Sequence, residues 1–338
     1  MRPSALLLSL CLALVLTACS SPAPRSGGTE SVSPSVSPSV SPTSVPSASP
    51  FVAPAGVRVT DLDTRPVGVA RVGTEVWTAL PDAGEVLTGD GRRIAVGDLP
   101  LRLVETPAGV WVSLIDEGAV VRIDPATAEV DLRVEVGRTD SEPEGLAFDG
   151  TSVWIVDQAG DRLLPMDPTT GELGRPVGVG VGPRLVTVAS SGSLFVANHT
   201  AGSLSRFDGD EVESRSAGSC LTPSGLLVAE GLLWVACTVD DQVIGFDLTT
   251  LKPAVRLPGL ATADAVVANG GLVYVVGQRG PVVWTIDPRT RQVVGELVLD
   301  EAGTTPENVA AAVVGDRLVV SHPEARRLYD VPLRLLRP

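Results

Sequence analysis

Residues 143–171 read PEGLAFDGTSVWIVDQAGDRLLPMDPTTG, and this stretch decides the fold. It holds three short apolar segments separated by turn residues, with Trp154 in the second segment and an Asp167-Pro168 turn after the third. Residues 174–179 add a fourth segment. Because no helical period runs through them, these segments predict four short strands, at 145–148, 152–156, 162–166 and 174–179.

The same unit recurs along the chain after residue 51. Alignment on the central aromatic gives seven equivalent positions at a spacing of roughly 40 residues, a period typical of propeller blades. These positions are Trp77, Trp111, Trp154, Phe195, Trp234, Tyr274 and Val319. Four strands per repeat and no helix predict an all-β protein, a seven-bladed β-propeller with four-stranded blades.

The seventh unit is one strand short. It supplies segments at 309–313, 317–321 and 326–331, with little chain after them. Residues 56–61, ahead of the first unit, resemble residues 131–136, the outer strand of unit two. We therefore predict that this N-terminal strand joins the last blade, which closes the ring and removes a free sheet edge.

The repeat motifs resemble those of a known group of proteins. Residues 143–147, 153–157 and 164–171 are similar to the repeats of streptogramin lyase-like, NHL and surface-layer (YVTN-type) propellers, and the similarity covers most of residues 66–331. The resemblance implies a seven-bladed propeller, a scaffold that carries several activities. For the streptogramin lyases it also implies a catalytic histidine near acidic residues in the late blades, where this chain has only His322.

The N-terminus indicates export. Arg2 precedes an apolar run at 5–16, which is too short to span a bilayer, and Leu16-Thr17-Ala18-Cys19 resembles the lipobox of bacterial lipoproteins. We predict a signal peptide at 1–18 and diacylation of Cys19, with palmitate-type chains. The predicted location is a lipid anchor in the cell membrane on its extracytoplasmic side, at the cell surface or in the periplasm.

Residues 19–50 form a Ser/Pro-rich segment between the lipid and the repeats. Its composition cannot bury enough apolar surface to fold, so we predict a disordered stalk followed by the propeller at 51–338. At ~3.1 Å per residue, about 30 residues of polyproline II would reach at most ~90 Å.

Charge and cysteine content limit the partners. The net charge of −14 disfavours nucleic acid and anionic headgroups, so we expect contact with the membrane through the lipid alone, and a monomer. Cys11 leaves with the signal peptide and Cys19 carries lipid, which leaves Cys220 and Cys237. Two thiols do not fill a tetrahedral zinc shell, so outside the cytoplasm we predict a disulfide.

Two recurrent features have structural explanations. The Asp-Pro-x-Thr turns could suggest calcium, but Asp and Pro at those positions also make turns by themselves. The repeated tryptophans could stack sugars, but apolar neighbours on both sides favour packing between blades.

The ligand site is expected where the loops that start each first strand and end each second strand converge on the central channel. At these positions units one and two are apolar and units three to seven are mostly polar, so the predicted mouth is asymmetric, although solvated loop ends would give part of the same pattern. The candidates are Glu144, Asp157, Arg184, Asn198, His199, Asp264, Gln278, Glu307 and His322.

These residues support three hypotheses. The first is a ligand-binding or interaction module for a small molecule or an envelope protein. The second is an enzyme of the lyase or lactonase type, in which His199 or His322 acts as a base, or in which Ca²⁺ or Mg²⁺ binds Glu144, Asp157, Asn198, Asp264 or Glu307. Both histidines could instead be exposed loop residues. The third is a structural envelope component.

Overall fold

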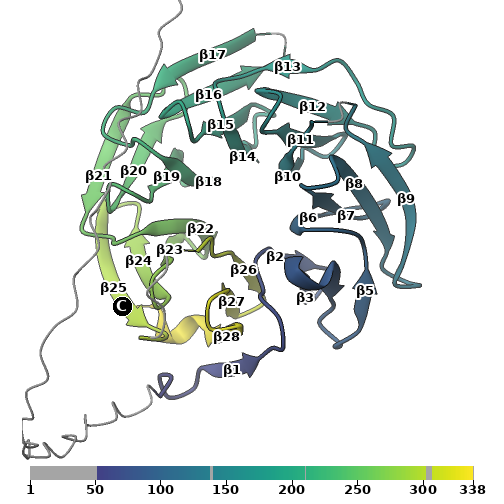
Figure 1. The fold of residues 1–338 in the computed structure, drawn as a ribbon. Coiled ribbons are helices and arrows are strands. Elements are labelled where there is room, and N and C mark those ends of the chain that lie inside the picture. Colours follow the sequence, from purple (N-terminus) through teal and green to yellow (C-terminus); the bar gives the residue numbers. More distant parts are fainter. Residues whose placement is uncertain (1–51, 138–139, 210, 302–306, 338) are drawn as a thin grey trace, which may run out of the picture. The chain divides into compact units, whose positions relative to one another are not determined.

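The computed structural model describes residues 52–137, 140–209, 211–301 and 307–337. These residues form seven four-stranded antiparallel sheets arranged as blades around a central channel, and the only helical elements among them are two short 3-10 turns (Figure 1). The predicted all-β, seven-bladed propeller is confirmed. The predicted signal peptide at 1–18, Cys19 and the predicted stalk at 19–50 lie outside the described residues.

Each blade follows the chain from its innermost strand outward. Blade one is β2 (Val69–Val72), β3 (Glu75–Leu80), β4 (Glu85–Leu87) and β5 (Arg93–Ala95); blade two is β6 (Pro100–Thr106), β7 (Gly109–Leu114), β8 (Ala119–Asp124) and β9 (Glu129–Glu135); blade three is β10 (Pro143–Phe148), β11 (Val153–Asp157), β12 (Arg162–Met166) and β13 (Val177–Gly178). Blade four is β14 (Pro183–Val188), β15 (Leu194–Asn198), β16 (Ser203–Asp208) and β17 (Glu211–Ser216); blade five is β18 (Pro223–Ala229), β19 (Leu232–Cys237), β20 (Gln242–Asp247) and β21 (Pro253–Pro258). Blade six is β22 (Ala263–Asn269), β23 (Leu272–Gly277), β24 (Val282–Asp287) and β25 (Gln292–Val298); blade seven is β26 (Ala311–Val314), β27 (Arg317–His322), β28 (Arg327–Pro332) and β1 (Arg58–Asp61). The 3-10 turns are η1 (Pro81–Ala83) and η2 (Leu333–Leu335).

The N-terminal strand closes the ring as predicted. β1 pairs antiparallel with β28, with Arg58 opposite Asp330 and Asp61 opposite Arg327 (Figure 1). Because β1 covers the outer edge of β28, blade seven has four strands like the other blades, and the first and last strands of the chain are held in one sheet.

The outer strand of blade three differs from the prediction. The segment expected at 174–179 forms only the two-residue strand β13. Just before it, the backbone N–H of Gly174 donates to the carbonyl of Pro165, and Met166 and Leu173 form an isolated bridge. The chain therefore pairs with β12 partly through this tight connection rather than through a longer strand.

The core lies between neighbouring blades. The six aromatic repeat positions are buried, which confirms packing as the role of Trp77, Trp111, Trp154, Trp234 and their equivalents. The Asp side chains of the Asp-Pro-type turns accept hydrogen bonds from backbone N–H groups two or three residues on, as at Asp167 and Asp247. Turn formation thus accounts for them without calcium.

The predicted disulfide is present. Cys220, in the loop before β18, is bonded to Cys237 at the end of β19, and both are fully buried. The bond ties together the two loops of blade five that lie on the channel face. Within the described ranges, no helix is long and apolar enough to cross a bilayer.

Candidate ligand site at the mouth of the propeller

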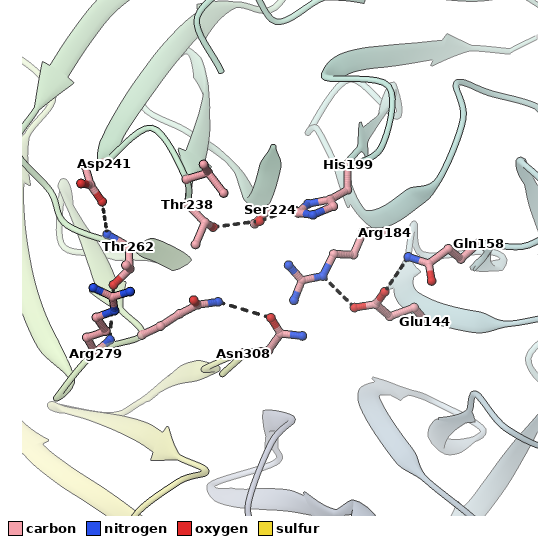
Figure 2. Close-up of a pocket in the computed structure, with 12 residues that line it drawn as sticks. Glu144, Gln158, Arg184, His199, Ser224, Thr238, Asp241, Thr262, Arg279 and Asn308 are labelled. Atoms are coloured by element: carbon pink, nitrogen blue, oxygen red, sulfur yellow. Dashed lines mark hydrogen bonds and ion pairs between the residues drawn. The ribbon is translucent and has the colours of Figure 1, made fainter. Parts of the chain in front are cut away.

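A cavity of about 620 Å³ opens at one end of the central channel. Its wall is built from the loops that start the first strands and end the second strands of blades three to seven (Figure 2). We call these residues the polar arc: Glu144, Gln158, Arg184, His199, Ser224, Thr238, Val239, Asp241, Thr262, Gln278, Arg279 and Asn308.

At blades one and two the mouth has a different lining from that at blades three to seven. A smaller hollow there is lined by Arg65, Val67, Leu99, Leu101, Glu307 and Asn308, and we call its three apolar residues, Val67, Leu99 and Leu101, the apolar arc. Arg65, at its rim, pairs with Asp82 and Glu307. The asymmetry expected from the sequence is therefore a property of the folded mouth.

A buried cluster of four charges forms the floor of the cavity. The Arg184 Nε donates to Glu144 Oε1 at 2.9 Å, and its Nη1 lies 3.5 Å from Asp264 Oδ1. Arg102 Nη2 approaches the same Glu144 oxygen at 3.5 Å. The backbone N–H of Val309 donates to Asp264 Oδ2 at 2.8 Å. Two arginines thus face two carboxylates, and the cluster is charge-balanced.

Two donors of this cluster have no partner among the described residues. Arg184 Nη2 is buried and makes no hydrogen bond within the described residues, and Arg102 Nε is in the same state. In Figure 2 the far end of the Arg184 guanidinium points away from Glu144 toward the middle of the polar arc. An unpaired buried donor is costly, so the site favours a hydrogen-bond acceptor at this point.

Burial and the neighbouring charges have opposing effects on the pKa values of Arg184 and Arg102. Burial works against the charge of Arg184, but Asp264 and Glu144 outweigh it and raise the pKa of the guanidinium. For Arg102 burial prevails and lowers its pKa. Because an arginine pKa starts above 12, both side chains stay charged near neutral pH.

Arg102 was missed by sequence reasoning because of a β-bulge. It follows Leu101, a residue of the apolar arc, and the pairing of β6 with β7 shifts between Pro100 and Leu103. A bulge breaks the simple alternation of side chains, so Arg102 reaches toward the channel axis and Glu144. A charge inside the apolar segment Leu101-Arg102-Leu103 was the available signal.

His199 is poised as a hydrogen-bond acceptor. Its Nδ1 lies 3.3 Å from the Pro223 carbonyl and 3.4 Å from Ser224 Oγ, which favours a proton on Nδ1. Its Nε2 has no partner in the part of the chain that the structure describes. Burial, and then the nearby Arg184 charge, lower the pKa of His199, so the ring is neutral at pH 7.

The remaining polar groups pair with one another. Thr238 donates either to Ser224 Oγ at 2.9 Å or to the Ala263 carbonyl at 2.7 Å, and Gln278 Nε2 donates to Asn308 Oδ1 at 3.3 Å. This hydrogen bond uses one of the two polar atoms of each amide, so Gln278 Oε1 and Asn308 Nδ2 stay available in two residues that line the cavity. The polar arc therefore offers both donors and acceptors.

Of the predicted site residues, Glu144, Arg184, His199 and Gln278 line the cavity, and Asp264 lies in its floor. Glu307 pairs with Arg65 and lines the smaller hollow beside blades one and two, while its neighbour Asn308 lines both hollows. Asp241, Thr262 and Arg279 also line the cavity; the two strand positions used for the sequence prediction do not include them.

The structure places Asp157 and Asn198 away from the cavity wall. Asp157 is fully buried and accepts from Arg162 Nε at 2.7 Å and from the Glu142 backbone N–H at 3.0 Å. Asn198 donates to Ser203 and Ser205. Each closes the end of its own blade, so both side chains are used for structure.

His322 also lies inside the protein. Its side chain is 2% exposed, its Nδ1 lies 3.8 Å from Asp300 Oδ2, and its ring is near that of Tyr329. The alternative that both histidines are exposed loop residues is therefore wrong, since His199 is half-buried as well. Burial lowers the pKa of His322 despite the neighbouring Asp300 carboxylate.

The residues proposed for a calcium or magnesium ion do not fit one. Glu144, Asp157, Asp264 and Glu307 each pair with an arginine, and Asn198, whose Oδ1 has no partner among the described residues, does not line the cavity. Across the described ranges, no three His, Cys, Asp or Glu side chains come together. A cation there would have to displace guanidinium groups, which makes these carboxylates poor metal ligands.

The fold and the mouth define a seven-bladed β-propeller with a polar site at one end of its channel. No family model and no curated protein matches the chain. Among solved structures, a streptogramin B lyase aligns with a TM-score of 0.69 at 15% identity, over 81% of this chain and 96% of that one. Virginiamycin B lyase from Staphylococcus aureus gives 0.70 at 14%, over 82% and 98%.

The likeness extends to propellers with other roles. The WD40 repeats of RRP9 align with a TM-score of 0.68 at 13% identity, over 83% of this chain and 99% of that one. Such low identity shows the fold alone.

Proposed function

We propose that the protein is a lipid-anchored, extracytoplasmic binding protein whose ligand occupies the mouth cavity. The single observation that carries this proposal is the unpaired, buried Nη2 of Arg184 at the floor of a cavity lined by hydrogen-bonding side chains. The sequence around Cys19 supports the anchor, and the Ser/Pro-rich segment supports a domain held away from the membrane.

The charge balance indicates the ligand's chemistry. Glu144 and Asp264 already neutralise Arg102 and Arg184, and the whole chain carries a net charge of −14. An anionic ligand would add an uncompensated buried charge, whereas a neutral carbonyl oxygen satisfies Arg184 Nη2 at lower cost. We therefore expect a neutral small molecule with a carbonyl group, such as an amide, ester or lactone.

A thermal-shift screen tests the binding function. Neutral amides, esters, lactones and sugars are added to the full-length protein and to a double Gln278→Ala, Asn308→Ala variant. We expect carbonyl compounds that raise the melting temperature of the wild type and raise that of the variant less. Thr151→Ala, an exposed residue in the loop between β10 and β11, on the face opposite the mouth, is the matched control. Stabilisation that is equal in all three proteins would refute binding at the mouth.

A second candidate function is an enzyme that uses His199 as a base. The specific observation is its Nδ1 contact with the Pro223 carbonyl together with a neutral, unpartnered Nε2 beside the Arg184 cation. A base next to a cation can remove a proton while the cation stabilises the developing negative charge. One neighbour is a catalytically inactive histidine variant of virginiamycin B lyase with quinupristin.

Quinupristin is the natural first test of the enzyme hypothesis. The enzyme hypothesis predicts slow conversion by the wild type, loss in His199→Gln, and no change in His322→Gln. Mass spectrometry of the compound after incubation distinguishes conversion from binding alone. An unchanged compound that still stabilises the protein would support the binding module over the lyase.

A further inference from the structure

Six of the seven junctions between blades have an apolar core. Clusters of buried hydrophobic residues join blades one and two, and so on through to blades six and seven. Among the described residues, no such cluster joins blade seven to blade one. Near the channel this junction is closed, because Ser321 Oγ donates to the Val67 carbonyl at 2.9 Å.

The difference arises from one repeat position. In each of the first six blades the aromatic of the second strand packs against the next blade, as Trp77 does against Val110 and Val112, and Tyr274 against Leu318 and Val320. Blade seven has Val319 at this position, so no ring projects onto blade one. The missing volume matters because protein interiors are otherwise close-packed.

A groove of about 530 Å³ lies at this junction, on the face opposite the mouth. Val319 and Leu328 of blade seven form one wall, and Val76 and Leu87 of blade one form the other. The turn after β4 contributes Gly89, whose missing side chain leaves room for Glu75: a Cβ there would lie 3.0 Å from Glu75 Oε2. The outer strands β4 and β5 have three residues each, so blade one covers little of the groove.

The charges of the groove select an occupant. Arg58 and Arg317 both pair with Asp330 and are engaged. The Glu75 carboxylate lines the groove and has no hydrogen bond or ion pair in the described part of the chain. Arg58, Arg317, Asp330 and Glu75 together carry no net charge, but Glu75 is the carboxylate of this set without a partner among the described residues, and a positively charged or N–H-donating group next to it is complementary to its charge.

We propose that the groove between blades seven and one binds a small aromatic amine, with its ring in the space above Val319 and its nitrogen toward Glu75. The other six junctions show that a ring of indole or phenol size fits this position in the repeat. Space left by a missing apolar side chain can bind a free aromatic molecule, and the apolar side chains of Val76, Leu87, Val319 and Leu328 offer a ring such contacts here. The site is separate from the mouth, so it does not depend on the proposed function.

Three probes with one ring system test the proposal: tryptamine, indole and indole-3-acetate. In calorimetric titrations of the full-length protein at low salt, we expect tryptamine to bind tightest and indole-3-acetate weakest. Because Glu75 is exposed, each step in charge should change affinity by about two- to fivefold. Glu75→Gln should bring tryptamine to the affinity of indole, while Glu129→Gln, an unpaired carboxylate on blade two, should change nothing.

Val319→Trp is the decisive variant. It supplies the missing ring, so it should abolish binding of all three probes and raise the melting temperature by a few degrees. If Val319→Trp does not fold, methyl NMR of the wild type replaces it, with shifts expected at Val319, Leu87 and Leu328 on addition of indole. Retained binding in Val319→Trp, unshifted methyls, or equal affinity for tryptamine and indole-3-acetate would overturn the proposal.

Discussion

The two arcs of the mouth use the same strand positions for different purposes. On the apolar arc Val67 and Leu101 start their first strands, and the mouth there is a shallow hollow. On the polar arc Glu144 and Arg184 occupy the equivalent positions and meet over the channel. The blade repeat therefore fixes where side chains point. The residue type at a few positions decides which part of the mouth can hold a ligand.

Removing the cation at the centre of the polar arc should have the largest effect on the stability of the protein. Arg184→Met leaves Glu144 and Asp264 buried with Arg102 alone, and losing one partner of a buried pair costs about 3–5 kcal/mol. We expect a loss of that size in the free energy of unfolding measured with urea. Arg175→Met, an exposed arginine of blade three, should stay within about 0.5 kcal/mol of the wild type. A loss below about 1 kcal/mol for Arg184→Met would mean that the cluster is solvated.

Removing the disulfide should cause the next largest loss of stability. Cys237 is the last residue of the second strand of its blade, the position that Leu80 and Leu114 occupy in blades one and two. Its bond to Cys220 closes a loop of sequence separation 17. A closed loop of this size contributes about 3 kcal/mol through the unfolded state. The double Cys220→Ser, Cys237→Ser variant should lose about that amount in urea unfolding. Equal stability of the oxidised and reduced wild type would contradict this.

The buried His322 and the half-buried His199 should make the stability of the protein depend on pH, with a smaller effect than the two variants above. Burial lowers the pKa of both His199 and His322 below the ordinary value of 6.5. Below pH 6.5 the unfolded chain therefore binds more protons than the folded one, and stability falls as the pH falls through this range. The melting temperature should drop between pH 7 and pH 5.5, and His322→Gln should reduce that drop. The same drop in His322→Gln and in the wild type would assign it to other groups.

The fold could be read almost completely from the sequence. The Trp77 to Tyr274 spacing gave the blade register, and residues 56–61 gave the closing strand β1, because both depend on local pattern and repetition. The strand β13 came out shorter because the chain already meets β12 through the isolated bridge between Met166 and Leu173, and strand propensity alone does not show where such pairing starts and stops.

The site was only partly predictable, for two physical reasons. Strand-end positions do not reveal whether a polar group faces the cavity or closes its own blade, so Asp157 and Asn198 were grouped with Glu144. A bulge moves the side-chain alternation by one residue, so Arg102 was missed although it contacts Glu144. Likewise Glu307 pairs with Arg65 and lines the smaller hollow, so Asn308 and not Glu307 lines the main cavity.

The central claim is that the polar arc, through Arg184, binds a neutral carbonyl group. Crystals of the protein soaked in N-methylacetamide, the simplest secondary amide, test it most directly. We expect one N-methylacetamide molecule in the mouth cavity, with its carbonyl oxygen accepting a hydrogen bond from Arg184 Nη2. An occupied apolar arc beside an empty polar arc, or molecules bound only outside the mouth, would contradict it.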